Sequence, residues 1–214
     1  MTVEIPINLA YEDELSLEVL LRLLNSPNVR SSDRCFSVGH CFHGRGYGYL
    51  KKNITRFNEA SKGMPYLILT DLDNKERAPL LINEWLPQTR NPNLIFRIAV
   101  REVESWLLAD DAGFARFLGI AKHKMPRDPD DLNDPKQTLI ALARASRKRD
   151  IKADIVPRPG STAKQGPAYN NCLIPFIRDK WNLEKARWHS HSLEKALRAL
   201  ETFEPQWQAQ RCQE

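Results

Sequence analysis

Apolar positions in the first half of the chain alternate between the spacing of a β-strand and that of an α-helix. In residues 3–10 an apolar side chain stands at every second position, which predicts a strand, and Pro6 within it indicates an edge or bulged strand. In residues 15–24 the apolar side chains repeat at three and four residues, which predicts an amphipathic helix. The alternation continues, with strands expected near 35–38, 65–70 and 94–100 and helices near 49–60, 77–85 and 103–118, the last broken near 110–113.

The strand expected at residues 65–70 is a continuous apolar run that ends at Asp71. Such a run is typical of a parallel strand that is buried on both faces. Strands that alternate with helices through short connections predict a mainly parallel sheet with helices on both faces. We therefore expect an α/β fold for residues 1–120.

The pattern changes after Gly119. Two polar, proline-rich segments are expected to be loops, at 123–135 and 156–167. Short helices are expected near 138–146, 171–181 and 192–203, with Ser192 as the N-cap of the last. Residues 121–214 are thus expected to form a helical extension packed on the α/β domain.

Composition narrows the class of protein. The chain has 214 residues, of which 42% are hydrophobic and 28% charged, so an ordinary globular protein is expected rather than a disordered one. No apolar run approaches the roughly 20 residues of a membrane span, and the N-terminus lacks the pattern of a secretory signal. The four cysteines have irregular spacing and are expected to be reduced thiols. We expect a cytoplasmic protein that has no membrane contact and that can form an oligomer.

Charge is unevenly distributed along the chain. Residues 1–110 hold 13 basic and 14 acidic side chains, whereas residues 111–214 hold 19 and 13, which gives net charges of −1 and +6. A basic half beside an acidic site would suit a bound polyanion, and a solvated helix face is the alternative. The candidates for contact with nucleic acid are five side chains of one stretch: Arg144, Arg147, Lys148, Arg149 and Lys152.

Acidic side chains follow three of the expected strands. Asp71 and Asp73 come after the strand at 65–70, where a backbone that stays extended would point both to one side. Glu12 occupies the equivalent place after the first strand, and Glu102 and Glu104 follow the strand at 94–100. Ligands of open α/β sheets bind at the carboxyl ends of strands, and a group of carboxylates there suits Mg²⁺. The alternative is that these acids only cap the helices that follow.

Glu102 and Glu104 are two residues apart, so they share a face if the backbone there stays extended. If the helix has already begun, their side chains are about 200° apart and only one can face the site. Lys136, at an expected helix start, could bind a phosphate or stabilise a leaving group, although an exposed helix lysine needs no function.

A cysteine- and glycine-rich segment offers weaker signals. The segment 39–48 is expected to be a mobile loop, and its glycines at 44, 46 and 48 could also cradle a phosphate. It lacks the Lys-Ser/Thr ending of a P-loop. Cysteines 35 and 41 and histidines 40 and 43 lack the paired spacing of a zinc site, and no orienting group for a Cys-His nucleophile can be identified.

Glu12 after one strand and Asp71-x-Asp73 after a later one, within an alternating α/β pattern, resemble the Toprim fold of topoisomerases, bacterial primases and nucleases of the overcoming-lysogenization-defect type. The wider sequence is similar to small stand-alone Toprim-like proteins often encoded beside an ATPase in defence-type gene pairs. The matching stretches begin at Gly46 (Gly-Tyr-Gly-Tyr-Leu), Leu69 (Leu-Thr-Asp-Leu-Asp), Ile98 (Ile-Ala-Val-Arg-Glu-Val-Glu-Ser-Trp-Leu-Leu-Ala-Asp), Asp134 (Asp-Pro-Lys) and Gly166 (Gly-Pro-Ala-Tyr-Asn).

The resemblance implies a Mg²⁺- or Mn²⁺-dependent nuclease that acts in phage defence together with an ATPase. Asp71 and Asp73 would hold the metal, and Glu12 would be a third ligand or general base. Glu104, and with less support Glu102, would complete the shell, and Lys136 would contact the nucleic-acid backbone together with the basic stretch. The family has Gly after the first Glu, whereas this chain has Asp13.

Two other functions remain open from the sequence. The first is a non-catalytic regulatory or inhibitory subunit that binds a partner ATPase; the chain itself has no Walker motif. The second is hydrolysis of small phosphate esters or nucleotides. The sequence does not distinguish DNA from RNA as a substrate.

Overall fold

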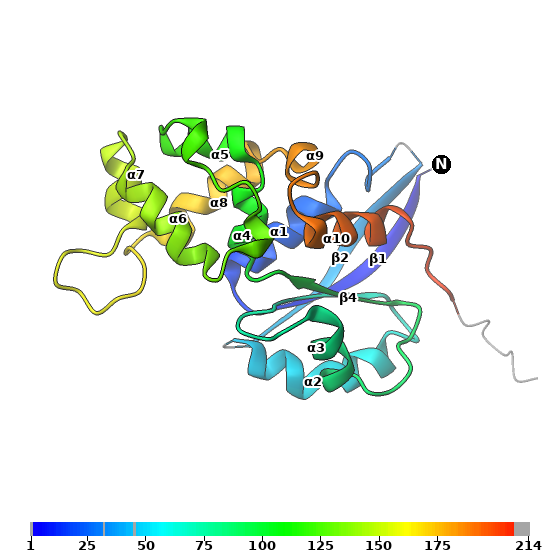
Figure 1. Cartoon of the computed structure of the whole chain (residues 1–214). Coiled ribbons are helices and arrows are strands. Elements are labelled where there is room, and N and C mark those ends of the chain that lie inside the picture. Colours follow the sequence, from blue (N-terminus) through cyan, green and yellow to red (C-terminus); the bar gives the residue numbers. More distant parts are fainter. Residues whose placement is uncertain (1, 32, 45, 208–214) are drawn as a thin grey trace, which may run out of the picture.

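The computed structural model describes residues 2–31, 33–44 and 46–207. Its centre is a four-stranded sheet in the order β2-β1-β3-β4, in which every neighbouring pair is parallel (Figure 1). The strands are β1 (Val3–Tyr11), β2 (Arg34–His43), β3 (Tyr66–Asp71) and β4 (Leu94–Ala99). The expected α/β fold with a parallel sheet is confirmed.

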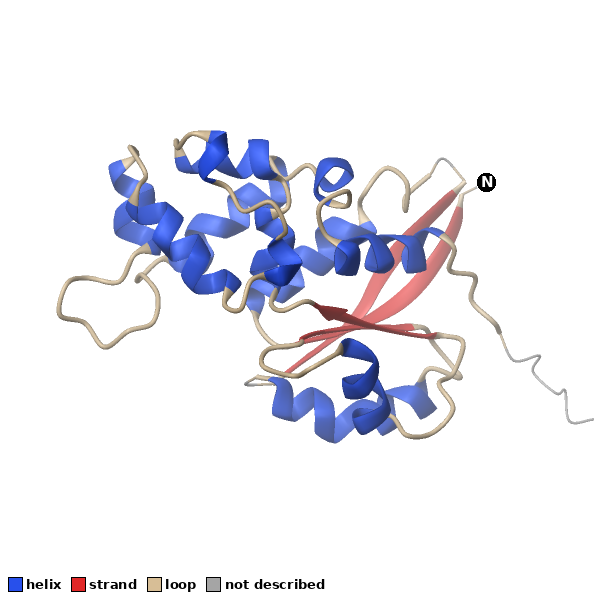
Figure 2. Cartoon of the chain, viewed as in Figure 1, coloured by secondary structure: helices blue, strands red, loops and turns tan. Residues whose placement is uncertain are grey.

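Helices cover both faces of the sheet (Figure 2). One face packs against α2 (Tyr47–Ala60) and α3 (Ala78–Trp85). The opposite face packs against α1 (Glu14–Leu24), α4 (Val103–Leu108) and α10 (His191–Glu201). Odd-numbered side chains of β1, such as Ile7 and Leu9, face this second layer, whereas Ala10 faces the first, as the two-residue period of a strand requires.

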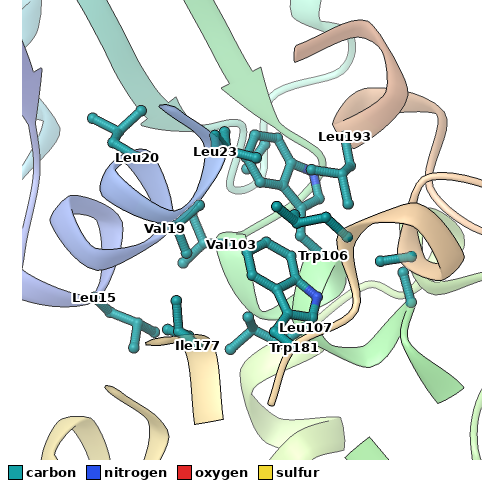
Figure 3. Close-up of a cluster of buried hydrophobic side chains, with 14 of the residues drawn as sticks. Leu15, Val19, Leu20, Leu23, Val103, Trp106, Leu107, Ile177, Trp181 and Leu193 are labelled. Carbon is teal, nitrogen blue, oxygen red and sulfur yellow. The ribbon is translucent and has the colours of Figure 1, made fainter. Parts of the chain in front are cut away.

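The remaining helices extend the second layer beyond the sheet (Figure 1). They are α5 (Asp111–Leu118), α6 (Pro135–Arg144), α7 (Arg149–Ile155), α8 (Tyr169–Asp179) and α9 (Leu183–Ala186), with short 3₁₀ turns at Lys122–Lys124 and Pro129–Asp131. Part of this layer belongs to the same hydrophobic core as the sheet. In Figure 3, leucines of α1 lie around Trp106 of α4 and Trp181, and both indoles are almost completely buried. Among the described helices, none combines the length and apolar character needed to cross a membrane.

Pro6 lies in the half of β1 that pairs with β2 alone. Strand β3 pairs with β1 only at residues 8–10, so the first half of this inner strand has one hydrogen-bonded neighbour. The register between β1 and β2 shifts between Ile7 and Leu9, which confirms the bulged alternative. A residue without an N–H is tolerated because the β3 side of the strand is open there.

The expectation of a loop from Gly39 was wrong, because β2 continues to His43. Gly39 is needed for close approach and not for a turn: a Cβ there would lie 2.7 Å from the side-chain oxygen of Asn8. That oxygen accepts a hydrogen bond of 2.8 Å from the backbone N–H of His40. Gly46, with φ of 80°, is instead the N-cap of α2.

Two helix starts and one additional helix in the extension also differ from expectation. Asp134 caps α6, which therefore starts at Pro135 rather than near 138. The basic stretch ends within α7, a helix that the sequence pattern did not predict. The N-cap of α10 is Ser190 and not Ser192, whose hydroxyl accepts a hydrogen bond of 2.7 Å from the indole N–H of Trp106. Ser190 precedes the helix in an extended conformation, and its hydroxyl accepts a hydrogen bond of 3.2 Å from the backbone N–H of Leu193.

Candidate metal and phosphodiester site

The carboxyl ends of β1, β3 and β4 lie side by side, because these strands are adjacent and parallel. Glu12 directly follows β1, Asp71 is the last residue of β3, and Glu102 comes three residues after the end of β4. Glu104 lies in the first turn of α4. We call these four residues the acidic centre. The strand order thus brings together the acids that the sequence places after three different strands.

Glu12 bridges β1 and β3. One of its carboxylate oxygens accepts hydrogen bonds from the hydroxyl of Thr70 and from the backbone N–H of Asp71, the latter at 3.1 Å. Burial raises the pKa of Glu12, the two hydrogen bonds oppose that rise, and the charges of Asp73 and Asp13 add to it. The side chain is half-buried and held in a defined place.

Asp71 connects the end of β3 to the start of α4. Its Oδ1 accepts a hydrogen bond of 3.0 Å from the backbone N–H of Val103. Burial raises the pKa of Asp71 well above its usual range, and the charges of Glu104 and Glu12 raise it further. The ionised form of Asp71 is therefore disfavoured until a cation compensates the negative charge.

Glu102 and Glu104 both reach Lys136, at the start of α6. Glu102 precedes α4 in an extended conformation, and its Oε2 accepts a hydrogen bond of 2.9 Å from the backbone N–H of Lys136. Oε1 of Glu104 lies 3.3 Å from the ammonium of Lys136. Both acids face the site because the helix begins between them, so neither the fully extended nor the fully helical alternative applies.

Glu104 is the most deeply buried member of the centre, with 1% of its surface exposed. The hydroxyl of Tyr169 donates a hydrogen bond of 3.0 Å to its Oε1. Its other oxygen, Oε2, is buried and has no hydrogen-bond partner among the described residues. A buried carboxylate oxygen without a partner is costly in a folded protein.

Lys136 is partly buried, with 28% of its side chain exposed, so it is not a simple solvated helix lysine. Burial alone would lower the pKa of its ammonium, but the negative charges of Glu104, Glu102 and Asp71 outweigh burial and raise the pKa. Burial, and next the charge of Glu104, raise the pKa of Glu102 to about 7. Three of the four carboxylates therefore act on one ammonium, which compensates only part of the negative charge of the centre.

Asp73 and Asp13 lie at the border of the centre. Asp73 does not continue the extended strand, because its backbone is left-handed with φ of 50°, so the assumption of an extended pair was wrong. It is exposed and lines the same pocket as Asp71. Asp13 is the N-cap of α1 and accepts hydrogen bonds of 2.8 Å from both the N–H and the hydroxyl of Ser16.

The chemistry of the donors suits a hard divalent cation. Among the described residues, no three His, Cys, Asp or Glu side chains already stand in the arrangement of a metal site. The centre nevertheless offers excess negative charge, carboxylates of raised pKa and the unpartnered oxygen of Glu104. Oxygen ligands of this kind fit Mg²⁺ or Mn²⁺, which also keep several waters.

The basic stretch lies away from the acidic centre. Arg144 ends the same helix that begins beside Lys136, so the rise along α6 separates the two backbones by about 12 Å. The ammonium of Lys148 is used within the fold: it donates hydrogen bonds to the carbonyl oxygens of Arg116 and Phe117, at 3.0 and 2.7 Å. Every member of the stretch is exposed, and the members other than Lys148 are Arg144, Arg147, Arg149 and Lys152.

The cysteine- and histidine-rich segment forms part of edge strand β2. Cys35 and Cys41 are free thiols, as is Cys172, and Cys212 lies outside the described residues. The ring of His43 stacks on that of Tyr11, with the ring centres 5.7 Å apart.

Two polar partners of the centre were not identified as such from the sequence. Thr70 immediately precedes Asp71, so its position at a strand end was a usable signal. Tyr169 is 65 residues from Glu104 along the chain and is the first residue of the amphipathic helix α8, and local sequence gives no indication of their contact.

Comparison of the chain with protein-family models, with curated proteins and with solved structures finds no match. The functional argument therefore rests on the residues and contacts described above.

Proposed function

We propose that the protein is a Mg²⁺- or Mn²⁺-dependent phosphodiesterase, a Toprim-like nuclease that cleaves nucleic acid. The observation that supports this most is the acidic centre, where four carboxylates gather at three adjacent strand ends and the ammonium of Lys136 pairs with Glu104. Oε2 of Glu104 lacks a hydrogen-bond partner in the part of the chain that the structure describes. The order of Glu12 and Asp71-x-Asp73 along a four-stranded parallel sheet is consistent with the Toprim resemblance.

In this proposal Asp71, Glu12 and Asp73 hold the metal, with Glu104 and Glu102 available to complete the shell. The metal supplies Lewis-acid stabilisation of the charge that develops at phosphorus and acidifies water. Lys136 is already positioned by Glu104, so its ammonium can bind a phosphate oxygen or stabilise the leaving group without further ordering. Such a site works by positioning and charge neutralisation and needs no covalent nucleophile.

The exposed arginines at the far end of α6 extend the proposal to a polymeric substrate. A polyanion whose scissile phosphate lies at the acidic centre would need favourable contacts elsewhere, because the acids repel its other phosphates. Arg144, Arg147 and Arg149 supply positive charge at a distance that a nucleic-acid backbone spans.

The first test is cleavage of plasmid DNA and structured RNA with Mg²⁺, with Mn²⁺ and with EDTA. We expect metal-dependent cleavage that falls at least about 100-fold in the double variant Asp71→Asn/Asp73→Asn. The matched control is Glu59→Gln, at an exposed carboxylate that pairs with Lys62 and should leave cleavage unchanged. Equal cleavage by the double variant and the wild type would contradict the proposal.

A role in phage defence beside a separately encoded ATPase belongs to the same proposal. A second candidate function is a regulatory subunit that acts by binding that ATPase. Trp188 favours a protein contact, because its side chain is 83% exposed in the connection between α9 and α10, and exposed tryptophans are frequent anchors of interfaces. Biological activity that survives Asp71→Asn/Asp73→Asn would favour this second function, and its loss with partner binding intact would favour the nuclease.

A further inference from the structure

We propose that a pocket beside the acidic centre binds a nucleobase, so that the substrate is held through an unstacked base. This proposal rests on the proposed nuclease function and specifies its substrate. The pocket has a volume of about 430 Å³ and lies between α2, α3 and the segment after β3. The residues that matter to the argument are Tyr47, Asp71, Asp73, Asn74, Lys75 and Trp85.

The pocket has an aromatic wall. Tyr47, the first residue of α2, stacks on Trp85 at the end of α3, with ring centres 6.3 Å apart and planes inclined by 24°. Trp85 in turn stacks on Phe96 of β4 at 5.8 Å. Phe96 and Trp85 are buried, whereas Tyr47 is 52% exposed, so it is the solvent-accessible end of a stack of three rings anchored in the core.

An exposed ring at the end of an ordered stack is a favourable place for a further planar group. Stacking of a base on an aromatic side chain contributes about 1–3 kcal/mol and does not depend strongly on the identity of the base. The ring of Tyr47 is already oriented by Trp85, so little side-chain entropy is lost when a base binds.

The polar lining suits a base better than a phosphate. The exposed carboxylate of Asp73 lines the pocket and would repel an anion in the absence of a metal. A base is uncharged, and the amide of Asn74 can both donate and accept hydrogen bonds at its edge. The phosphate attached to that base would then lie towards Asp71, which belongs to both the pocket and the acidic centre.

Positive charge is present at the edge of the pocket. The ammonium groups of Lys51 and Lys75 both pair with Glu84, at 2.7 and 3.3 Å. Two cations thus share one carboxylate, and the surplus positive charge is available to the phosphates that flank a bound base.

A base enters the pocket only when it is free of its neighbours and its pairing partner. The structure therefore favours a single-stranded over a duplex substrate, because unstacking a paired base costs a few kcal/mol. A free nucleotide presents the same chemistry, a base joined to phosphate, and the experiment distinguishes these two sources.

The experiment measures binding and cleavage separately on the full chain. Fluorescence anisotropy with labelled oligonucleotides, in EDTA and again with Ca²⁺, compares a single strand with the matching duplex, and unlabelled AMP serves as competitor. We expect tighter binding of the single strand and about a tenfold loss of its affinity in Tyr47→Ala, which is the lower range of stacking energies. Tyr47→Phe should bind like the wild type, because it keeps the ring.

The matched control is Trp188→Ala, which removes an exposed aromatic ring at a distant site and should leave affinity unchanged. Displacement by AMP at concentrations similar to those of the oligonucleotide would identify free nucleotides as the source of the base. Unchanged affinity in Tyr47→Ala, or equal loss in Tyr47→Phe, would overturn the pocket proposal even if Asp71→Asn/Asp73→Asn still abolishes cleavage. The expected pattern at Tyr47 without any metal-dependent cleavage would instead keep the pocket and overturn the nuclease.

Discussion

Buried acids of the helical layer and buried acids of the acidic centre have opposite surroundings. In the helical layer, Glu18 accepts two hydrogen bonds from the guanidinium of Arg178. Asp110 is 1% exposed, and its two oxygens accept from the N–H groups of Gly113 and Asn182, at 3.1 and 2.9 Å. In the acidic centre, Glu104 is equally buried, but one of its oxygens has no partner among the residues that the structure describes.

The difference separates acids that stabilise the fold from acids that the fold must tolerate. A buried carboxylate with complete hydrogen bonding joins elements that are distant in sequence, as Asp110 joins α5 to the segment before α9. Burial, and next the charges of Glu104 and Glu12, raise the pKa of Asp71, so the ionised form of such a carboxylate destabilises the folded chain. Retention of such a group in a cleft is an indication of function.

The largest difference in stability is expected when the same Asp→Asn substitution is made at Asp110 and at Asp71. Asp110→Asn replaces one of the two acceptor oxygens with an amide NH₂ group, which is a donor and would face a backbone N–H. The free energy of unfolding should therefore fall by about 2 kcal/mol. Asp71→Asn keeps the oxygen that accepts from Val103 and removes a repelled charge, so in EDTA the free energy of unfolding should stay the same or rise. Urea denaturation of both variants in EDTA measures the difference. A loss in Asp71→Asn as large as that in Asp110→Asn would show that both acids are structural.

Added Mg²⁺ should raise the stability of the folded chain through the acidic centre and not through Asp110. Mg²⁺ that binds only the folded chain adds about 1.4 kcal/mol of stability at ten times its dissociation constant. We expect this gain, measured as a rise in Tm with Mg²⁺, in the wild type and in Asp110→Asn, which leaves the acidic centre intact. Asp71→Asn should lose the gain. A rise in Tm that is the same in all three proteins would place the bound cation elsewhere.

The comparison also explains what the sequence could predict. Strands, their order of appearance and the acids at their ends follow from local patterns, so Glu12 and Asp71 were identified as candidates before their proximity was known. Their convergence depends on the order β2-β1-β3-β4, which no local pattern encodes. The contacts of Lys136 and Tyr169 with Glu104 depend on how α6 and α8 pack, over separations of 32 and 65 residues.

Smaller departures have the same cause. The glycine at position 39 suggested a loop. It is instead required by the close approach of the Asn8 side chain from the neighbouring strand, which cannot be inferred from local sequence. Ser192 had the pattern of an N-cap, yet its hydroxyl accepts a hydrogen bond from the indole of Trp106, 86 residues away along the chain. Tertiary partners decided both positions.

The smallest effect is expected within the basic stretch, where Lys148 has hydrogen-bond partners in the fold and Arg147 is exposed. Lys148 donates to the last carbonyl groups of α5, a stabilising position for a cation at a helix C-terminus. Lys148→Ala should therefore lower the free energy of unfolding by about 1 kcal/mol. Arg147→Ala, which removes an exposed side chain, should change it by less than about 0.5 kcal/mol. In nucleic-acid binding the order should reverse, because a free guanidinium can neutralise a phosphate: Arg147→Ala should reduce the slope of log K against log salt by about 1. Equal effects of the two variants in both assays would mean that the contacts of Lys148 with α5 do not distinguish it from its neighbours.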